Sequence, residues 1–222
     1  MQLLLIRHGQ TLPNVRGEVA TLAPGPGLTP LGEQQAAALP GALEHRTIDT
    51  VFVSSLLRTH LTAAPLAAAR QLRPIELSGL GEIEAGDLEN RSDPHAVEKY
   101  HGVFSAWAAG DKDVEMPSGP NGFAFFDRFD EAVRAILASG ADTAVAISHG
   151  AAIRTWAGAH SVNIDEQFIR AHPLGNTGLV EVHGDFETGW TCVSWTRGPV
   201  GGENLVDHTA HDPTGERLLT GA

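Results

Sequence analysis

The chain has 222 residues, of which 42% are hydrophobic and 19% charged, an ordinary composition for a globular protein with one sizeable core. The formal net charge of -12 argues against nucleic acid or an anionic membrane as the main partner, because both need a basic face. A few local arginines would still accept a small anionic substrate, and the single Cys192, which we interpret as a buried strand residue, cannot form an intrachain disulfide.

The first half of the chain predicts alternating strands and helices. A helix should begin at Thr29-Pro30, since threonine is a good N-cap and proline fits the first helical position. In chain order we expect a buried strand over 2–7, a Gly- and Pro-rich loop over 10–28, that helix, a strand over 50–54, a helix from near Arg58 to Arg70, and a short strand over 75–77.

The second half continues the alternation and ends in two antiparallel strands. We expect a carboxylate-rich loop over 79–92, partly helical structure over 93–120, an amphipathic helix over 121–139, a buried strand over 142–148, a helix over 150–158, strands over 178–183 and 190–195, and an irregular tail over about 198–222. The pattern predicts one α/β domain over 1–222, a three-layer α/β/α sandwich around a mostly parallel sheet, with a helical insert at about 83–125 capping the site.

Two of the predicted strands end in the same way. Leu3-Leu4-Leu5-Ile6 is followed by Arg7-His8-Gly9, and Ala144-Val145-Ala146-Ile147 is followed by Ser148-His149-Gly150. Such a strand places an imidazole at the rim of the sheet, where we expect the glycine to let a ligand approach the backbone. Arg58 also follows a predicted strand, so the three residues should share one rim.

These residue types suit phosphate chemistry. Arginine binds phosphate with two parallel hydrogen bonds, a neutral imidazole can attack phosphorus, and a carboxylic acid can protonate the leaving alkoxide. A carboxylate-rich loop around Glu82 could supply that acid. An Arg-His-Gly triplet on its own is weak evidence, because it occurs often by chance.

Taken together, the motifs resemble the histidine phosphatase superfamily, also called the phosphoglycerate mutase-like family. The resemblance rests on motifs in the family's order between residue 3 and about residue 180. They are Arg7-His8-Gly9-Gln10-Thr11 with Asn14, Leu28-Thr29-Pro30-Leu31-Gly32-Glu33, Ser54-Ser55-Leu56-Leu57-Arg58-Thr59, Leu80-Gly81-Glu82-Ile83-Glu84, Ser148-His149-Gly150 and Asn176-Thr177.

The resemblance implies a phosphoglycerate mutase-like fold and a role for each matching residue. His8 would be the nucleophile that becomes phosphorylated, and Glu82 the proton donor, with Glu84 as the alternative acid. The implied phosphate-binding residues are Arg7, Asn14, Arg58 and His149, and Thr21 would also line the pocket. No metal or organic cofactor is expected for hydrolysis.

Two departures from the family pattern bear on the reaction. The loop over 15–22 does not match many relatives, which places substrate contacts there in doubt. Mutases follow the proton donor with a basic run, whereas this chain has Ile83-Glu84-Ala85-Gly86, which favours a phosphatase. A phosphoglycerate mutase and a non-catalytic protein that binds a phosphorylated ligand are the alternatives.

Further expectations concern partners and location. We expect a small phosphorylated substrate, with specificity in residues 15–27 and 83–125, and pairing of the terminal strands would allow a homodimer. The N-terminus lacks a signal-peptide pattern, so a cytoplasmic protein is expected. His208 and His211, with Asp207 and Asp212, superficially resemble a metal cluster, but a polar irregular tail favours a surface interpretation.

Overall fold

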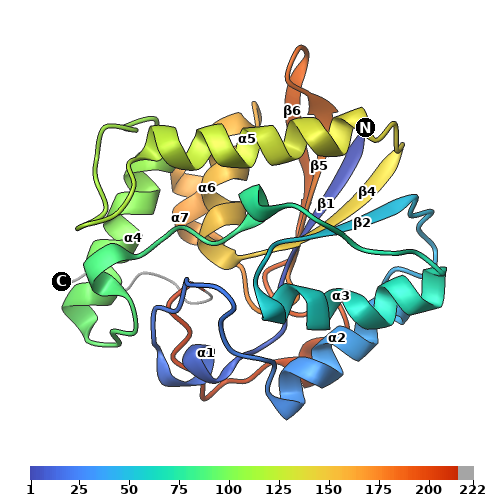
Figure 1. Cartoon of the computed structure of the whole chain (residues 1–222), viewed down its shortest axis with the longest axis horizontal. Coiled ribbons are helices and arrows are strands. Elements are labelled where there is room, and N and C mark those ends of the chain that lie inside the picture. Colours follow the sequence, from blue (N-terminus) through green and yellow to red (C-terminus); the bar gives the residue numbers. More distant parts are fainter. Residues whose placement is uncertain (215–222) are drawn as a thin grey trace.

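A computed structural model describes residues 1–214 and contains one six-stranded sheet (Figure 1). The strands lie in the order β3-β2-β4-β1-β5-β6. Those from β3 to β1 are parallel, whereas β5 pairs antiparallel with β1 and with β6, which confirms the mostly parallel sheet. The strands are β1 (Gln2–Arg7), β2 (Thr50–Val53), β3 (Ile75–Glu76), β4 (Thr143–Ser148), β5 (Leu179–Asp185) and β6 (Gly189–Trp195).

The helices follow the predicted alternation closely. The helix at Thr29 begins as predicted, because the Thr29 side chain accepts a hydrogen bond from the Gly32 backbone N–H. The helices are α1 (Leu12–Arg16), α2 (Pro30–Ala42), α3 (Leu57–Arg70), α4 (Pro94–Ala108), α5 (Gly122–Ala138), α6 (Gly150–His160) and α7 (Glu166–Ala171). Short 3-10 helices cover Ser78–Leu80, Gly86–Leu88 and Glu203–Leu205.

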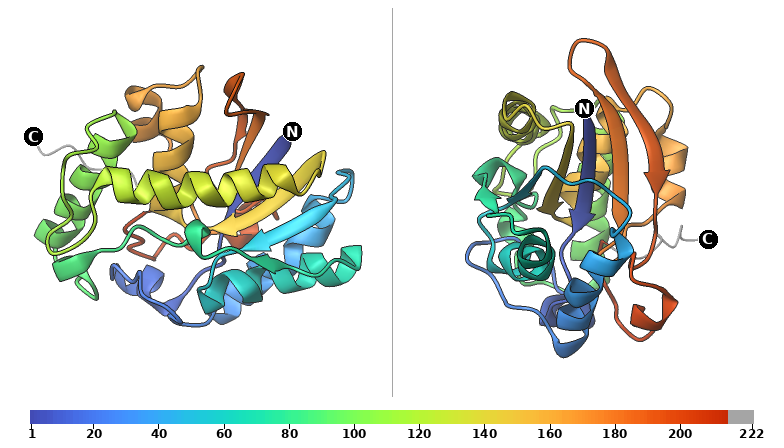
Figure 2. Two further views of the ribbon diagram at one scale, coloured as in Figure 1. Left: turned by 45° about the horizontal axis from the view of Figure 1, so that its top comes forward. Right: turned by 90° about the vertical axis from the view of Figure 1, so that its right-hand side faces the viewer.

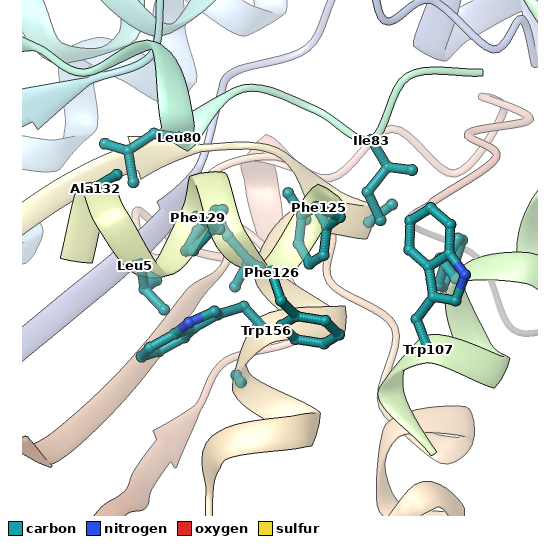
Figure 3. Close-up of a cluster of buried hydrophobic side chains, with 14 of the residues drawn as sticks. Leu5, Leu80, Ile83, Trp107, Phe125, Phe126, Phe129, Ala132 and Trp156 are labelled. Atoms are coloured by element: carbon teal, nitrogen blue, oxygen red, sulfur yellow. The ribbon is translucent and has the colours of Figure 1, made fainter. Parts of the chain in front are cut away.

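Two hydrophobic clusters hold helices on both faces of the sheet, which confirms the three-layer architecture (Figures 1 and 2). On one face, Leu4 and Ile6 of β1 pack with residues of α2 and α3. On the other face, Leu5 of β1 belongs to an aromatic-rich cluster in which Phe129 of α5 lies beside Trp156 of α6 (Figure 3). Alternate residues of a buried strand point to opposite faces, so this strand needs apolar residues throughout.

The structure differs from the sequence prediction in two helices. The predicted loop over 10–28 contains α1, which the Asn14 side chain stabilises by accepting a hydrogen bond from the Thr11 N–H at 2.9 Å. The prediction also left α7 without an element. That helix is six residues long, and the Asp165 side chain caps it by accepting from the Phe168 N–H. Helices this short carry too little hydrophobic periodicity to be recognised from sequence.

Gly9 has a different role from the one expected. A Cβ at Gly9 would lie 2.7 Å from the Gly32 carbonyl oxygen, and a Cβ at Gly32 would lie 2.2 Å from the Gln10 carbonyl oxygen. The two glycines therefore allow the start of α2 to pack directly against the loop after β1. At Gly9 the missing side chain makes room for protein backbone, a role that the sequence analysis did not anticipate.

Candidate active site

His8 and His149 lie side by side at the carboxyl ends of the two central strands. β1 and β4 are parallel neighbours, and their register places Arg7 opposite Ser148. The next residue of each strand is therefore a histidine, and the two ring centroids are 5.2 Å apart. Both side chains are buried. The sheet brings together the two histidines that the sequence singled out.

The His8 ring is held in one orientation by its own loop. Nδ1 lies 2.8 Å from the Gly9 carbonyl oxygen, which can only accept, so Nδ1 carries the hydrogen and Nε2 keeps its lone pair. Burial, followed by the nearby charges of Arg58 and Arg7, lowers the pKa of His8 well below its ordinary value. His8 is therefore a neutral imidazole with Nε2 available to react.

Part of the buried Arg58 guanidinium has no hydrogen-bond acceptor among the described residues. It stands in the first turn of α3, and its NH2 group donates to the Ala20 carbonyl and to Nδ1 of His149, both at 3.1 Å. Within residues 1–214, its buried Nε and NH1 have no hydrogen-bond partner. Burial lowers the pKa of Arg58 to about 10, which leaves it cationic at neutral pH. Buried donors without acceptors are costly, and an anion would satisfy them.

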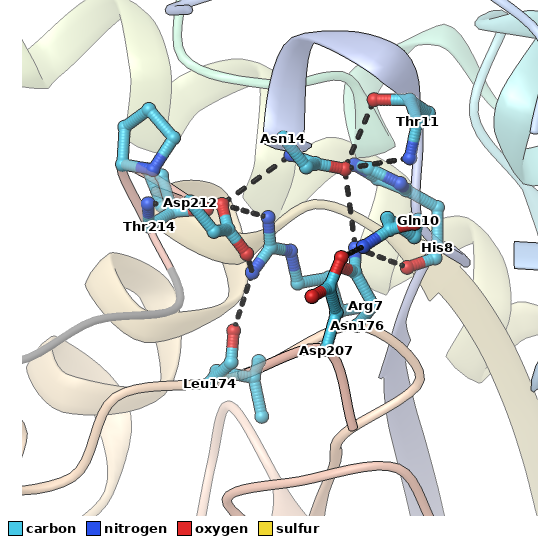
Figure 4. Close-up of polar contacts among 12 residues, drawn as sticks. Arg7, His8, Gln10, Thr11, Asn14, Leu174, Asn176, Asp207, Asp212 and Thr214 are labelled. Carbon is cyan, nitrogen blue, oxygen red and sulfur yellow. Dashed lines mark hydrogen bonds and ion pairs between the residues drawn. The ribbon is translucent and has the colours of Figure 1, made fainter. Parts of the chain in front are cut away.

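Arg7 and Asn14 are linked by an acid from the end of the chain. NH1 and NH2 of Arg7 donate to the two carboxylate oxygens of Asp212 at 2.5 and 2.7 Å, and NH1 also donates to the Leu174 carbonyl at 2.7 Å (Figure 4). Asn14 Nδ2 donates to Asp212 at 3.3 Å, while its Oδ1 accepts from Asn176 at 3.2 Å. Both predicted phosphate ligands are thus fixed by neighbours.

The side chain of Glu82, which follows the 3-10 helix Ser78–Leu80, is buried against the N-terminus of α6. Its Oε1 accepts from the backbone N–H groups of Ile83 and Ala152, both at 2.9 Å, and its Oε2 accepts from Ala151 at 3.3 Å. Burial raises the pKa of Glu82, although these N–H groups and Arg58 oppose the shift. Glu84 is exposed by contrast. The environment of Glu82 favours a carboxyl group that can hold and release a proton.

Five of the six predicted site residues line one cavity. The exception is His149, which is fully buried beside Arg58 with both ring nitrogens in hydrogen bonds. Thr21 also lines the cavity. The lining residues are Arg7, His8, Thr11, Pro13, Asn14, Glu18, Val19, Ala20, Thr21, Arg58, Glu82, Tyr100, Pro213 and Thr214.

Residues 212–214 contribute to the site, which no sequence motif predicted. Pro213 and Thr214 line the cavity and Asp212 binds Arg7, although the segment was interpreted as an irregular tail. One signal was available, since an arginine within a buried strand needs an acidic partner. The chain has 27 acidic residues, and nothing in the sequence selects Asp212 among them.

Within residues 1–214, no cluster of three or more His, Cys, Asp or Glu side chains has a geometry that could hold a metal ion. His208 is exposed and lies 3.7 Å from Glu203. In the same range, no helix combines the length and the apolar character that a membrane span requires.

The chain is similar to known proteins in sequence and in fold. The model of the histidine phosphatase superfamily (branch 1) matches residues 3–197. The solved structure of a mycobacterial glucosyl-3-phosphoglycerate phosphatase superposes with a TM-score of 0.72 at 25% identity, covering 88% of this chain and 98% of that one.

Two curated relatives extend the comparison. The PE-PGRS family protein PE_PGRS11 of Mycobacterium tuberculosis is 38% identical over 217 residues, which is 90% of this chain. An adenosylcobalamin/alpha-ribazole phosphatase of Salmonella typhimurium is 34% identical over 128 residues, 58% of this chain. The matched regions are 37% and 62% of those proteins, so the chain spans less than two thirds of either relative.

Proposed function

The chain belongs to the histidine phosphatase superfamily, and from this we propose that it is a phosphomonoesterase that hydrolyses a small phosphorylated metabolite through a phosphohistidine on His8. One observation carries the proposal. His8 offers a lone pair on Nε2, in a cavity that also holds two arginines and a protonatable carboxyl group. Nucleophile, anion ligands and acid are the three components that such a reaction needs.

In the first step, Nε2 of His8 attacks phosphorus and the bond from phosphorus to the ester oxygen breaks. Glu82 gives its proton to the departing oxygen, so the product leaves as an alcohol. Arg58 donates to the phosphoryl oxygens through Nε and NH1, while Arg7 at the end of β1 and Asn14 on α1 add further donors. His149 contributes by holding Arg58 in place.

In the second step, water attacks phosphorus and the bond from phosphorus to Nε2 breaks. The Glu82 carboxylate, which lost its proton in the first step, takes one from the water. Inorganic phosphate then leaves and the enzyme returns to its starting state. The cycle consumes one water and needs no metal or organic cofactor.

The substrate itself is proposed only by class. Relatives in the family are named for different phosphate esters, among them glucosyl-3-phosphoglycerate and alpha-ribazole phosphates. In this chain the cavity lining includes residues 18–21 and Tyr100, and Glu18 adds a second acidic residue to Glu82. A carboxylate in the lining disfavours a second phosphate on the substrate, which supports hydrolysis over mutase-type transfer.

The deciding experiment measures release of inorganic phosphate from p-nitrophenyl phosphate, without added metal, by the wild type, by His8→Ala and by His95→Ala. His95 is an exposed histidine on α4 and serves as the matched control. We expect turnover by the wild type and the control but none by His8→Ala. Turnover by His8→Ala would rule out the phosphohistidine. Binding without turnover by the wild type would support the non-catalytic alternative.

A further inference from the structure

The segment 206–214 lies across the rim of the sheet and is fixed from several elements. Gln10 Nε2 donates to the Asp207 carboxylate at 2.8 Å, and His101 of α4 is hydrogen-bonded to the Pro213 carbonyl. Arg154 of α6 donates to the Thr214 carbonyl at 3.3 Å. The contacts at Pro213 and Thr214 hold the neighbouring Asp212 in the interior, where its side chain is 10% exposed beside an Arg7 side chain that is 1% exposed.

Asp212 uses only one side of the Arg7 guanidinium. Its two oxygens bind NH1 and NH2, and the Leu174 carbonyl takes the second hydrogen of NH1. A guanidinium has five N–H donors in a plane, so Nε and the outer hydrogen of NH2 remain as a second pair. Within the described residues, the buried Nε has no partner. Arg7 can therefore hold a carboxylate and a phosphate at the same time.

The carboxylate lies outside the cavity, behind the guanidinium. Arg7, Pro213 and Thr214 line the cavity, whereas Asp212 does not and instead borders a neighbouring pocket with Gln10 and Asn176. The free Nε lies beside Gly150, where a Cβ would come within 3.0 Å of it. The same carboxylate receives a hydrogen bond from Asn14 of α1, which is also a proposed phosphate ligand (Figure 4).

We propose that Asp212 is a positioning residue, which holds Arg7 and Asn14 in the orientation that binds the phosphoryl group. The inference rests on the proposed function, since it concerns the same phosphate site. A bidentate carboxylate fixes both the position and the plane of the guanidinium, so the remaining donors point in one direction before substrate arrives. The C-terminal segment is thereby part of the active site and not a surface extension.

The opposite interpretation is that the Asp212 carboxylate imitates a phosphate and competes with substrate for Arg7. The two interpretations predict opposite results. A positioning carboxylate makes phosphate bind more tightly, so its removal weakens binding. A competing carboxylate makes phosphate bind less tightly, so its removal strengthens binding and raises kcat/KM.

The experiment compares Asp212→Asn, Asp212→Glu and the control Asp207→Asn in the full chain. Asp207 lies on the same segment but binds Gln10 and Thr209, not Arg7. Binding of inorganic phosphate is measured by calorimetry, and KM and kcat with p-nitrophenyl phosphate, with thermal unfolding recorded for each variant. We expect Asp212→Asn to weaken phosphate binding and to raise KM by about tenfold or more, with a smaller change in kcat.

We expect the phosphate affinity of Asp212→Glu to lie between those of the wild type and Asp212→Asn, because glutamate keeps the charge but moves the guanidinium. The affinity of Asp207→Asn should match that of the wild type. A purely structural role would lower the unfolding temperature without this ordering of phosphate affinities. If Asp212→Asn does not fold, Asp212→Glu takes its place in the test. Phosphate binding by Asp212→Glu as tight as that of the wild type then overturns the proposal.

The same measurements separate this proposal from the proposed function. A wild type that neither binds nor releases phosphate contradicts both. A wild type that binds and turns over, with Asp212→Asn unchanged or improved in phosphate affinity, contradicts only the role of Asp212.

Discussion

Arg58 donates a hydrogen bond to Nδ1 of His149 at 3.1 Å. Because a guanidinium cannot accept, Nδ1 carries the lone pair and Nε2 carries the hydrogen, which points to Ser54 Oγ at 2.8 Å. His8 has the reverse arrangement, with its hydrogen on Nδ1. The two adjacent imidazoles are therefore neutral and in opposite tautomers. His8 keeps a lone pair on Nε2, whereas His149 uses the lone pair of Nδ1 to accept from Arg58.

This arrangement can be observed directly by NMR. Burial and the charge of Arg58 lower the pKa of both His8 and His149, so both rings should stay neutral at pH 6. Long-range proton–nitrogen correlations on histidine-labelled protein should show His8 protonated at Nδ1 and His149 at Nε2, with His8→Ala providing the assignment. Finding the same tautomer in both rings, or an imidazolium, would contradict the reaction scheme.

Glu82→Gln should separate substrates by their leaving groups. Alkyl phosphates need a proton on the departing oxygen, so their turnover should fall by about a hundredfold or more. Turnover of p-nitrophenyl phosphate should change far less, because p-nitrophenolate leaves without help. Kinetics with both substrates test this, and Glu84→Gln is the control because Glu84 is exposed. Equal losses on both substrates would remove Glu82 from the role of acid.

The stability of the protein should fall in mildly acidic solution, in part through His101. Burial, followed by the charge of Arg154, lowers the pKa of His101 to about 4 from its ordinary value of 6.5. The unfolded state therefore binds the proton first, and stability present above pH 6.5 is lost as the pH falls towards 4. The loss attributable to His101 is on the order of 3 kcal/mol.

Urea unfolding between pH 7 and pH 4 tests this dependence. His101→Gln keeps an amide donor near the position of Nε2, which contacts the Pro213 carbonyl, and it has no titrating ring. Its stability should therefore fall less steeply with acid than that of the wild type. His95→Gln, the same change at an exposed position on the same helix, should follow the wild-type curve. Parallel curves for all three proteins would show that His101 is not a source of the acid sensitivity.

Two glycines of α2 should respond in opposite ways to alanine. At Gly32 a Cβ would lie 2.2 Å from the Gln10 carbonyl oxygen, so Gly32→Ala should destabilise the fold by about 1–3 kcal/mol and reduce turnover by displacing the loop that carries His8. At the exposed Gly41 a Cβ would meet open space, so Gly41→Ala should stabilise by about 0.5–1 kcal/mol. Urea unfolding midpoints and kcat values of both variants test this. A Gly32→Ala variant with wild-type stability would contradict the close packing of α2 against the loop after β1.

The sequence predicts the sheet and its large helices because their signals are local. Runs such as Leu3 to Ile6 and the cap at Thr29 each define an element within a few residues. The resemblance to a family added the residues that line the cavity, but not their hydrogen-bond partners. That Arg7 pairs with Asp212, and that His149 supports Arg58 without lining the cavity, depends on side-chain contacts between distant segments. No periodicity or motif encodes such contacts.

The pair formed by Arg7 and Asp212 joins residues that are 205 positions apart. During synthesis the ribosome adds about 5–20 residues per second, so roughly 10–40 seconds pass between the incorporation of Arg7 and that of Asp212. Throughout that interval the nascent chain carries a strand arginine without its counter-ion. A chain released before residue 212 would therefore contain the whole sheet, but it would lack the acidic partner of Arg7 and two residues of the cavity lining, Pro213 and Thr214.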